Sequence, residues 1–403
     1  MSVLKGKKIL LGVTAGIAAY KTAHLVRLFI KAGAEVQVVM TPASKDFITP
    51  LTLSTLSKNP VHSTFYEQSD ENELWNNHVD LGLWADLMLI APVTANSLSK
   101  MAHGTVDNLL LAVYLSAKCP VYFAPAMDLD MFKHNSTTEN ISKLQKFGNV
   151  LIPAASGELA SGLVGEGRMA EPEDIVRFIE ADLASKLPLK GKKILITAGP
   201  TYEAIDPVRF IGNHSSGKMG FNLALCAANL GAEVVLVSGP SSQTISHSSV
   251  KRIDVVSAEQ MYNTVFEYYA QVDIAIAAAA VADYAPVSTA TQKIKKTEGN
   301  LPIELKATKD ILAAMGISKQ DQFLVGFALE TNNELENARG KLARKNLDMI
   351  VLNSLRDKGA AFGGDTNKIS VIDNSNIVTE FALKSKEDVA SDIFTEILKR
   401  ANV

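Results

Sequence analysis

The sequence is poor in cysteine and tryptophan, with two of each among 403 residues. The two cysteines, Cys119 and Cys226, exclude a disulfide scaffold and a multi-cysteine metal site, and so low a content is typical of a reducing cytosol. Long apolar runs are absent too. The longest run, Ile274 to Ala282, is far too short to cross a bilayer, so we expect no membrane-spanning segment.

The chain also has no excess of charge of one sign. Lys and Arg total 40, Asp and Glu total 43, and the net charge at pH 7 is −3. Broad binding to nucleic acid or to a membrane surface requires a cationic excess, so we expect neither as a partner. The N-terminus does not have the pattern of an export signal, because Gly12 and Gly16 interrupt its apolar stretch. We therefore expect a cytoplasmic protein.

What the sequence does contain is an internal repeat. Gly-Lys-Lys-Ile-Leu occurs at 6–10 and again at 191–195, and Gly-Ala-Glu-Val occurs at 33–36 and again at 231–234. Each copy has the pattern of a buried strand, a small-residue turn, a helix and a second strand, which opens a βαβ unit. The repeat predicts two α/β domains, 1–189 and 190–403. Pro188 marks a linker between Ser185 and Lys190.

Short apolar runs predict the remaining strands of both domains. They span residues 87–91, 120–124, 272–280, 323–327 and 349–352. Residues 369–372 and 377–381 flank Asp-Asn-Ser-Asn and predict an antiparallel hairpin, and 385–400 predict an amphipathic helix. We expect two doubly wound, mostly parallel, Rossmann-like α/β sheets. Such sheets bind ligands outside the carboxyl ends of their strands.

Small and polar residues follow the strands of the first half. The turn from Gly12 to Lys21 contains Thr14 and lets a ligand approach the backbone, but it is not G-x-G-x-x-G. It favours a flavin or a sugar monophosphate over a dinucleotide, and a plain tight turn remains the alternative. Thr41 and Ser44 follow the next strand, and Asn96 follows the strand at 87–91. Helix capping explains one such residue at each strand end, but not the whole set.

These motifs resemble those of the flavin-dependent cysteine decarboxylases. The resemblance rests on G-V-T-A-G-I-A-A-Y-K at 12–21, N-N-H-V-D-L at 76–81, P-V-T-A-N at 92–96, P-A-M-D-L-D-M at 125–131 and G-E-G-R-M at 165–169. It implies a flavodoxin-like FMN domain that decarboxylates 4′-phosphopantothenoylcysteine. Carried over, Thr14, Thr41, Ser44 and Asn96 would hold FMN. His78 would be the catalytic base or orient the substrate, although a lone histidine is more often structural.

Two candidate catalytic positions depart from the pattern of this family. Asp128 stands where the family has an asparagine associated with the substrate carboxylate, and a second carboxylate there repels that group unless it is protonated or redirected. Ser161 aligns with the family's proton-donating cysteine, and a hydroxyl is a much poorer acid than a thiol. Two alternatives therefore stay open for the first domain: an impaired FMN-binding domain beside an active ligase, and a flavin-binding regulatory subunit.

The second half opens with a longer turn that ends in N-H-S-S-G-K-M-G, residues 213–220. Its hydroxyls, glycines and Lys218 precede a helix, as in a phosphate cradle, although a capped helix start fits equally well. The alanines that end the strand at 272–280 leave space for a flat ring, and Asp283 is placed to reach a ribose hydroxyl or a metal. Lysines at 293, 295 and 296 form a basic loop, Gln292 to Asn300. This loop is either a solvated face or a cover for a triphosphate.

These segments resemble phosphopantothenate–cysteine ligases of the bacterial, CTP-using type. The family's order is kept by T-A-G-P-T at 197–201, P-V-R-F-I-G-N-H-S-S-G-K-M-G at 207–220, A-A-V-A-D-Y at 279–284, K-I-K-K at 293–296, V-G-F-A-L-E-T-N at 325–332 and R-K-N-L-D at 344–348. The resemblance implies that CTP activates the pantothenate carboxylate as an acyl-cytidylate with release of pyrophosphate. The amine of cysteine then displaces CMP, and Mg²⁺ shields the phosphates.

The same resemblance assigns roles to individual residues. Asn213 would grip the acyl-cytidylate, and Arg209 would reach the substrate phosphate across a dimer interface. Lys293, Lys341 and Lys345 would neutralise the triphosphate. The nucleotide pocket would be formed by Ala277, Ala278, Ala279, Asp283, Lys309, Asp310, Ile311, Leu312 and Phe327. No metal ligand is assigned.

Together the two resemblances imply a bifunctional enzyme of coenzyme A synthesis. The ligase would make phosphopantothenoylcysteine, and the decarboxylase would consume it. The partners would be small molecules, namely 4′-phosphopantothenate, cysteine and CTP, with FMN and Mg²⁺ as cofactors. Because the family's first domains trimerise and its second domains dimerise, we expect a homo-oligomer, which in a fused chain can close as a dodecamer.

Overall fold

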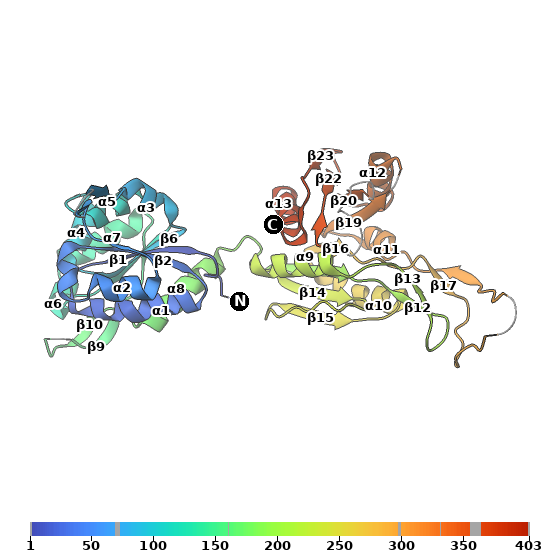
Figure 1. Ribbon diagram of the computed structural model, residues 1–403, viewed down its shortest axis with the longest axis horizontal. Coiled ribbons are helices and arrows are strands. Elements are labelled where there is room, and N and C mark those ends of the chain that lie inside the picture. Colours follow the sequence, from blue (N-terminus) through green and yellow to red (C-terminus); the bar gives the residue numbers. More distant parts are fainter. Residues whose placement is uncertain are drawn as a thin grey trace. The chain divides into compact units, whose positions relative to one another are not determined.

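The chain divides into two compact units, Met1–Ser185 and Lys186–Val403 (Figure 1). The structure is a computed structural model, and it describes residues 2–68, 73–159, 161–296, 300–330, 332–354 and 364–401. The division falls at the start of the segment 185–190, where the linker was predicted. Within these ranges, no helix combines the length and the apolar character needed to cross a membrane.

The first unit is built on a six-stranded sheet in which all pairs are parallel. Its strands are β1 (Lys8–Val13), β2 (Glu35–Met40), β3 (Val61–His62), β6 (Leu87–Val93), β7 (Val121–Pro125) and β8 (Val150–Leu151). They lie in the order β3-β2-β1-β6-β7-β8. This is the order of the Rossmann fold rather than that of flavodoxin. The predicted strands at 87–91 and 120–124 are confirmed as β6 and β7.

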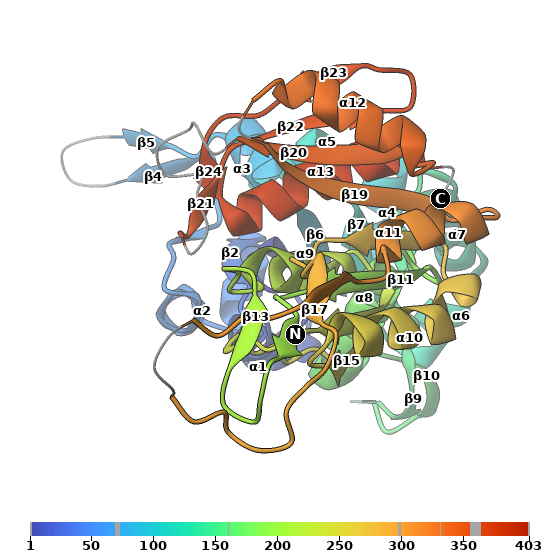
Figure 2. The same cartoon turned by 90° about the vertical axis from the view of Figure 1, so that its right-hand side faces the viewer.

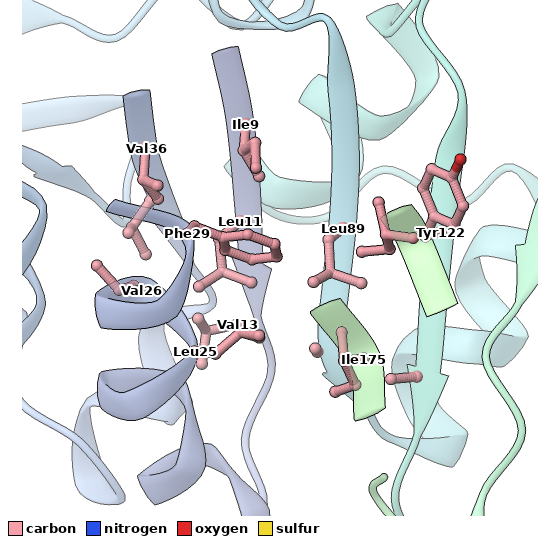
Figure 3. Packing of buried hydrophobic residues seen from close by; sticks show 14 of the residues in the cluster. Ile9, Leu11, Val13, Leu25, Val26, Phe29, Val36, Leu89, Tyr122 and Ile175 are labelled. Carbon is pink, nitrogen blue, oxygen red and sulfur yellow. The ribbon is translucent and has the colours of Figure 1, made fainter. Parts of the chain in front are cut away.

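Helices cover both faces of this sheet. They are η1 (Ile17–Lys21), α1 (Thr22–Lys31), η2 (Pro42–Asp46), α2 (Pro50–Ser57), α3 (His78–Trp84), α4 (Ala95–His103), α5 (Leu109–Ser116), α6 (Leu129–Lys133), α7 (Asn135–Lys146) and α8 (Pro172–Ser185). On one face, Phe29 of α1 and Ile175 of α8 pack against Leu11 and Leu89 (Figure 3). On the other face, α3, α4, α5 and α7 contribute to a second core. Neighbouring residues of a strand face opposite cores, which explains why these strands are apolar throughout.

Two hairpins stand outside the sheet of the first unit. One consists of β4 (Tyr66–Gln68) and β5 (Glu73–Trp75), and it extends away from the helices (Figure 2). The other consists of β9 (Ala155–Glu158) and β10 (Val164–Arg168). The Met127 amide N–H donates to the Gly167 carbonyl at 3.0 Å, which joins this second hairpin to the chain after β7. A Cβ atom at Gly167 would lie 2.4 Å from the Met127 carbonyl oxygen, so this approach requires glycine.

The second unit has an eight-stranded sheet in the order β15-β14-β11-β16-β19-β20-β22-β23. Its strands are β11 (Lys193–Ala198), β14 (Glu233–Ser238), β15 (Val250–Asp254), β16 (Ile274–Ala277), β19 (Phe323–Glu330), β20 (Met349–Ser354), β22 (Ile369–Asp373) and β23 (Val378–Glu380). The first six in this order are parallel, and β22 and β23 are antiparallel. The predicted antiparallel hairpin is therefore confirmed, as are the two doubly wound, mostly parallel sheets.

Helices and short hairpins complete the second unit. The helices are α9 (Lys218–Asn229), α10 (Ala258–Tyr268), η3 (Tyr269–Gln271), α11 (Ile311–Ser318), α12 (Glu334–Arg344) and α13 (Lys386–Arg400). The short strands are β12 (Tyr202–Ala204), β13 (Phe210–Gly212), β17 (Tyr284–Pro286), β18 (Leu305–Ala307), β21 (Thr366–Asn367) and β24 (Lys384–Ser385). Helices α9 and α13 pack on one face of the sheet, and α10, α11 and α12 on the other. The pairs β12–β13 and β17–β18 extend away from the sheet (Figure 1).

The strand predicted at 272–280 is shorter in the structure, because β16 ends at Ala277. Beyond that point the Ala280 amide N–H donates to the Gly199 carbonyl at 2.9 Å, and the Ala280 carbonyl accepts from the Thr201 amide N–H at 3.3 Å. The alanines after β16 thus leave the ladder and pair with the turn after β11. Their backbone lies across the carboxyl end of the sheet.

Candidate functional site

The first unit contains a cavity of about 1010 Å³ outside the carboxyl ends of β1, β2, β6 and β7. The strand order reverses between β1 and β6, which is where open α/β sheets bind ligands. The walls are the turns after these four strands, together with residues of the β9–β10 hairpin. Polar groups among them include Tyr20, Thr41, Asn96, Asp128, Ser161 and Arg168.

Thr41 lines this cavity with an unpaired hydroxyl. Its Oγ1 atom is buried and has no hydrogen-bond partner among the described residues. A buried polar atom without a partner costs about 1–3 kcal/mol, so its position at a cavity wall indicates that a bound molecule supplies the partner. Asn96, near the start of α4, lines the same wall. The placement of both residues fits the prediction that they hold FMN.

Thr14 and Ser44, which were also predicted to hold FMN, do not line the cavity. The Thr14 hydroxyl donates to the Pro92 carbonyl at 2.8 Å and accepts from the Thr94 amide N–H at 3.1 Å, which ties the end of β1 to the end of β6. The Ser44 hydroxyl donates to the Thr41 carbonyl at 2.7 Å. Both hydroxyls are fully buried and already paired. In this structure both residues stabilise turns beside the cavity, and a direct contact of either with FMN stays a prediction.

Asp128 and Ser161, the two residues that differ from the decarboxylase pattern, both line this cavity. The Ser161 hydroxyl donates to Asp128 Oδ1 at 2.8 Å, and the Leu129 amide N–H donates to the same oxygen at 2.8 Å. Within the described ranges Asp128 forms no ion pair. No cysteine lines the cavity, so no described thiol takes the place of Ser161. Both residues could be predicted from the sequence, whereas their contact is visible only in the fold.

His78 lies outside this cavity, as the first residue of α3. Its ring packs edge-on against Phe65 and Trp75, with centroid distances of 6.2 and 6.5 Å. Its Nδ1 atom is buried and has no hydrogen-bond partner in the part of the chain that the structure describes. The fold of one copy therefore does not bring His78 together with Asp128 and Ser161.

The second unit contains a cavity of about 470 Å³ at the carboxyl edge of its sheet, where the strand order reverses between β11 and β16. It is formed by the start of α9, the chain after β16, the ends of β19 and β20, and the start of α13. The predicted site residues that line it are Asn213, Ala278, Ala279, Asp283, Phe327 and Lys341. Ser215, Ser216 and Lys218 of the suspected phosphate cradle line it as well.

Asn213 fastens the alanine segment that follows β16. Its Nδ2 donates to the Ala280 carbonyl at 3.3 Å and to the Val281 carbonyl at 2.9 Å. Lys341, which lines the same cavity, donates from Nζ to the Phe327 carbonyl in β19 at 2.7 Å. Both side chains therefore hold backbone segments of the cavity in place.

Six residues predicted for the nucleotide pocket do not line it, namely Ala277, Lys309, Asp310, Ile311, Leu312 and Lys345. Ile311 and Leu312 are buried in the core beneath α11. Asp310 caps α11 through the Ala313 amide N–H and forms an ion pair with Lys345 at 2.7 Å. Burial raises the pKa of Asp310, but the Lys345 and Ala313 hydrogen bonds outweigh it and lower the net value.

The remaining residues of this group have other partners. Lys309 lies over the Tyr262 ring, 4.7 Å from its centroid, and Ala277 is the last residue of β16. None of the six side chains lines the cavity of this chain, and their role in nucleotide binding stays a prediction.

Arg209 and Lys293 do not line the cavity either. Arg209 Nε donates to Asp206 Oδ2 at 2.9 Å, and its guanidinium also donates to the Ile294 carbonyl at 2.6 Å. Burial raises the pKa of Asp206, but hydrogen bonds from Val208, Arg209 and Ile294 hold it well below its ordinary value. These contacts fasten the basic loop that carries Lys293 to the β12–β13 hairpin. Residues 297–299 of that loop lie outside the described ranges.

Three polar residues that line the cavity were not predicted from the sequence, namely Asn353, Asn367 and Lys386. They lie at the end of β20, in β21 and at the start of α13. None belongs to a motif, and only the fold brings them beside α9. Elsewhere, no group of three or more His, Cys, Asp or Glu side chains in the described part of the chain is placed to hold a metal ion.

Two family models match the chain, one on each unit. A model described as "Flavoprotein" matches residues 2–184, and one described as "DNA/pantothenate metabolism flavoprotein C-terminal domain" matches residues 189–401. Their boundaries follow the division of the structure into two units.

Curated relatives match through both units. The chain is 43% identical to the coenzyme A biosynthesis bifunctional protein CoaBC of Bacillus subtilis, over 98% of this chain and 97% of that protein. It is 45% identical to the CoaBC protein of Vibrio parahaemolyticus, over 98% and 99% of the two chains. It is also 55% identical to a cysteine/cysteine sulfinic acid decarboxylase from an unknown prokaryotic organism, over 87% of this chain and 99% of the relative. The chain therefore belongs to the family of bifunctional flavoproteins of coenzyme A biosynthesis.

Proposed function

We propose that this chain catalyses two consecutive steps of coenzyme A biosynthesis. The second unit joins 4′-phosphopantothenate to cysteine at the expense of CTP, and the first unit decarboxylates the product to 4′-phosphopantetheine. One observation carries the proposal: each family model falls on a unit that has its own cavity at the carboxyl edge of a doubly wound sheet. The substrates are small molecules. Since free cysteine thiol requires a reducing compartment, we place the reaction in the cytoplasm.

The second cavity supports a nucleotide-dependent ligation. The small side chains of Ala278 and Ala279 leave room for a flat base, and Lys218 and Lys341 offer positive charge for phosphates. Asn213 is placed to contact the acyl-cytidylate. Mg²⁺ usually binds through phosphate oxygens and few protein ligands, so the proposal needs no dedicated metal site. The loop of Lys293 and the hairpin of Arg209 would complete the site from a second copy of the chain.

The first cavity supports the binding of FMN and a thiol substrate. Thr41 and Asn96 would hold the cofactor, and Asp128 and Ser161 face the remaining space. When bound, FMN supplies hydride transfer to and from the carbon that bears sulfur. His78 does not line the cavity of its own chain, so a catalytic role for it requires another copy that presents it there. We therefore propose a homo-oligomer, for which a dodecamer remains the expected closed form.

A one-pot reaction tests both steps at once. Purified protein with 4′-phosphopantothenate, cysteine, CTP and Mg²⁺ should yield 4′-phosphopantetheine, detected by mass spectrometry. The reaction without CTP serves as the control and should yield neither product. Accumulation of phosphopantothenoylcysteine alone would contradict the decarboxylase half and favour an impaired first unit. Absence of any CTP-dependent product would contradict the ligase half.

Thr41→Val tests the placement of FMN. We expect FMN to bind about 10-fold more weakly, because valine lacks the hydroxyl that would form a hydrogen bond to the cofactor. The apo protein should be no less stable, since the change removes a buried hydroxyl that lacks a partner. Flavin fluorescence gives the dissociation constant, and thermal unfolding gives the stability. Thr138→Val, on the exposed side of α7, is the matched control. Unchanged FMN affinity would remove Thr41 from the flavin site.

A second candidate activity for the first unit is decarboxylation of free cysteine or cysteine sulfinic acid. The relative that is 55% identical bears that name. In phosphopantothenoylcysteine the cysteine nitrogen is an uncharged amide, whereas in the free amino acid it is an ammonium group. The Asp128 carboxylate faces the cavity without an ion-pair partner among the described residues, and it complements an ammonium group. Release of cysteamine from cysteine, in the absence of CTP and 4′-phosphopantothenate, would identify this activity.

A further inference from the structure

Lys386 is a buried lysine at the wall of the second cavity. It is 9% exposed, and it lines the cavity as the first residue of α13. Its Nζ atom makes no hydrogen bond or ion pair with the residues that the structure describes. Burial lowers the pKa of Lys386, and nearby Lys218 lowers it further, while Asp365 opposes the change. Lysine is almost never buried in this way unless it is paired, so the absence of a partner among the described residues points to a ligand.

The surroundings of Lys386 are rich in positive charge. Lys218, the first residue of the 12-residue helix α9, lines the same cavity and forms an ion pair with Asp365. The side chain of Asp365 is 83% exposed, so solvent screens much of its charge. The amide groups at the start of α9 and the hydroxyls of Ser215 and Ser216 add donors. Among the described residues, the exposed carboxylate of Asp365 thus faces two ammonium groups and a helix N-terminus, and Asp283 is the one further carboxylate that lines the cavity.

The position of Lys386 in its own helix is unfavourable for folding. A cation at the first turn opposes the helix dipole, which favours acidic residues there. Glu387 and Asp388 follow this preference, but Lys386 does not. A residue that costs stability in the empty protein is typical of a binding site, where the ligand offsets the cost.

We propose that Lys386 binds the phosphate chain of CTP beyond the α-phosphate and stabilises pyrophosphate as it leaves. The inference rests on the proposed ligase function. In that reaction a carboxylate oxygen of the substrate forms a bond to the α-phosphorus. The bond from the α-phosphorus to the bridging oxygen breaks, and its electron pair goes to pyrophosphate. Negative charge therefore grows where Lys386 and Lys218 lie, and a fixed cation lowers the barrier.

Binding of CTP, CDP and CMP to the full-length chain tests this assignment. Lys386→Met should weaken CTP and CDP binding about 10- to 100-fold, since it removes a charge-assisted contact, and should change CMP binding less than about 3-fold. Lys386→Arg should retain most of the affinity for CTP. The matched control is Lys384→Met, two positions away in β24, where the lysine pairs with Asp392 outside the cavity. It should bind all three nucleotides as the wild type does.

Thermal unfolding of the nucleotide-free proteins separates a binding role from a structural one. Lys386→Met should unfold at the same temperature as the wild type or higher, because it removes a buried charge that lacks a close partner. A lower unfolding temperature with unchanged CTP affinity would assign a structural role and overturn the inference. Equal losses for CMP and CTP would overturn it as well, since the contact would then lie at the α-phosphate or the nucleoside. A wild-type chain that binds no CTP would overturn the proposed ligase function itself.

Discussion

Replacing Asn213 by aspartate should reduce ligation at least about 1000-fold in kcat/KM. The amide donates to the Ala280 and Val281 carbonyls, and a carboxylate turns both contacts into repulsion between oxygens. It also adds negative charge at the wall that we assign to the nucleotide, which repels CTP and the acyl-cytidylate. Two lost hydrogen bonds and this repulsion together amount to about 4 kcal/mol, and each 1.4 kcal/mol is tenfold. Release of pyrophosphate measures the first half-reaction, and mass spectrometry measures the product.

The decarboxylation reaction of the same protein serves as the control for Asn213→Asp. Decarboxylation of supplied phosphopantothenoylcysteine should proceed at the wild-type rate, because Asn213 belongs to the second unit and the first cavity lies in the other. His214→Gln, one residue along and outside the cavity, should ligate normally. Ligation above about a tenth of the wild-type rate in Asn213→Asp would show that the two carbonyl contacts are dispensable.

Replacing Asp128 by asparagine should shift the substrate preference of the first cavity about 10- to 100-fold toward phosphopantothenoylcysteine and away from free cysteine. The charge that complements the ammonium group of free cysteine is lost, whereas relief of the repulsion from the substrate carboxylate is common to both substrates and cancels in the ratio. A charge-assisted contact contributes about 1.5–3 kcal/mol, or about 10- to 100-fold. Rates of CO₂ release from each substrate give the ratio of kcat/KM values.

Asp128→Asn removes the charge of the side chain and keeps its shape nearly unchanged. An amide oxygen at the position of Oδ1 still accepts from Ser161 and from the Leu129 amide N–H, so α6 and its cap should be unaffected. Asp130→Asn removes the same charge from an exposed position of the same helix and is the matched control. An unchanged ratio in Asp128→Asn would mean that this carboxylate does not select the substrate, and the second candidate activity would lose its structural basis.

The sheets could be predicted from sequence because their strands are apolar on both faces. The runs at β6 and β7, and those of β19 and β20 before their polar ends at Glu330 and Asn353, have no charged or amide side chain that would allow a solvated face, and this pattern is typical of parallel strands between helices. The end of β16 could not be predicted, because alanines continue unchanged past Ala277. What ends that strand is a contact with Gly199 on a turn far away in sequence.

The sites could be predicted in part for a related physical reason. Motifs mark where a backbone turns, and residues of those turns such as Thr41 and Asn213 do line the cavities. A motif does not show which way a side chain points, so Thr14 and Asp310, whose polar groups already have partners within the chain, could not be separated from the residues that line the cavities. Lys386 lies in no sequence motif, and its place in the cavity depends on the start of α13 lying beside α9 in the fold.

The division of the chain has a consequence for the order of synthesis on the ribosome. Every residue that lines the first cavity lies between Ala15 and Met169, and the second cavity begins only at Asn213 and ends at Lys386. The nascent chain therefore completes the decarboxylase cavity before any part of the ligase cavity exists. The first unit can bind its flavin while translation continues. The cavity for the step that acts second in the pathway is therefore the one that is translated first.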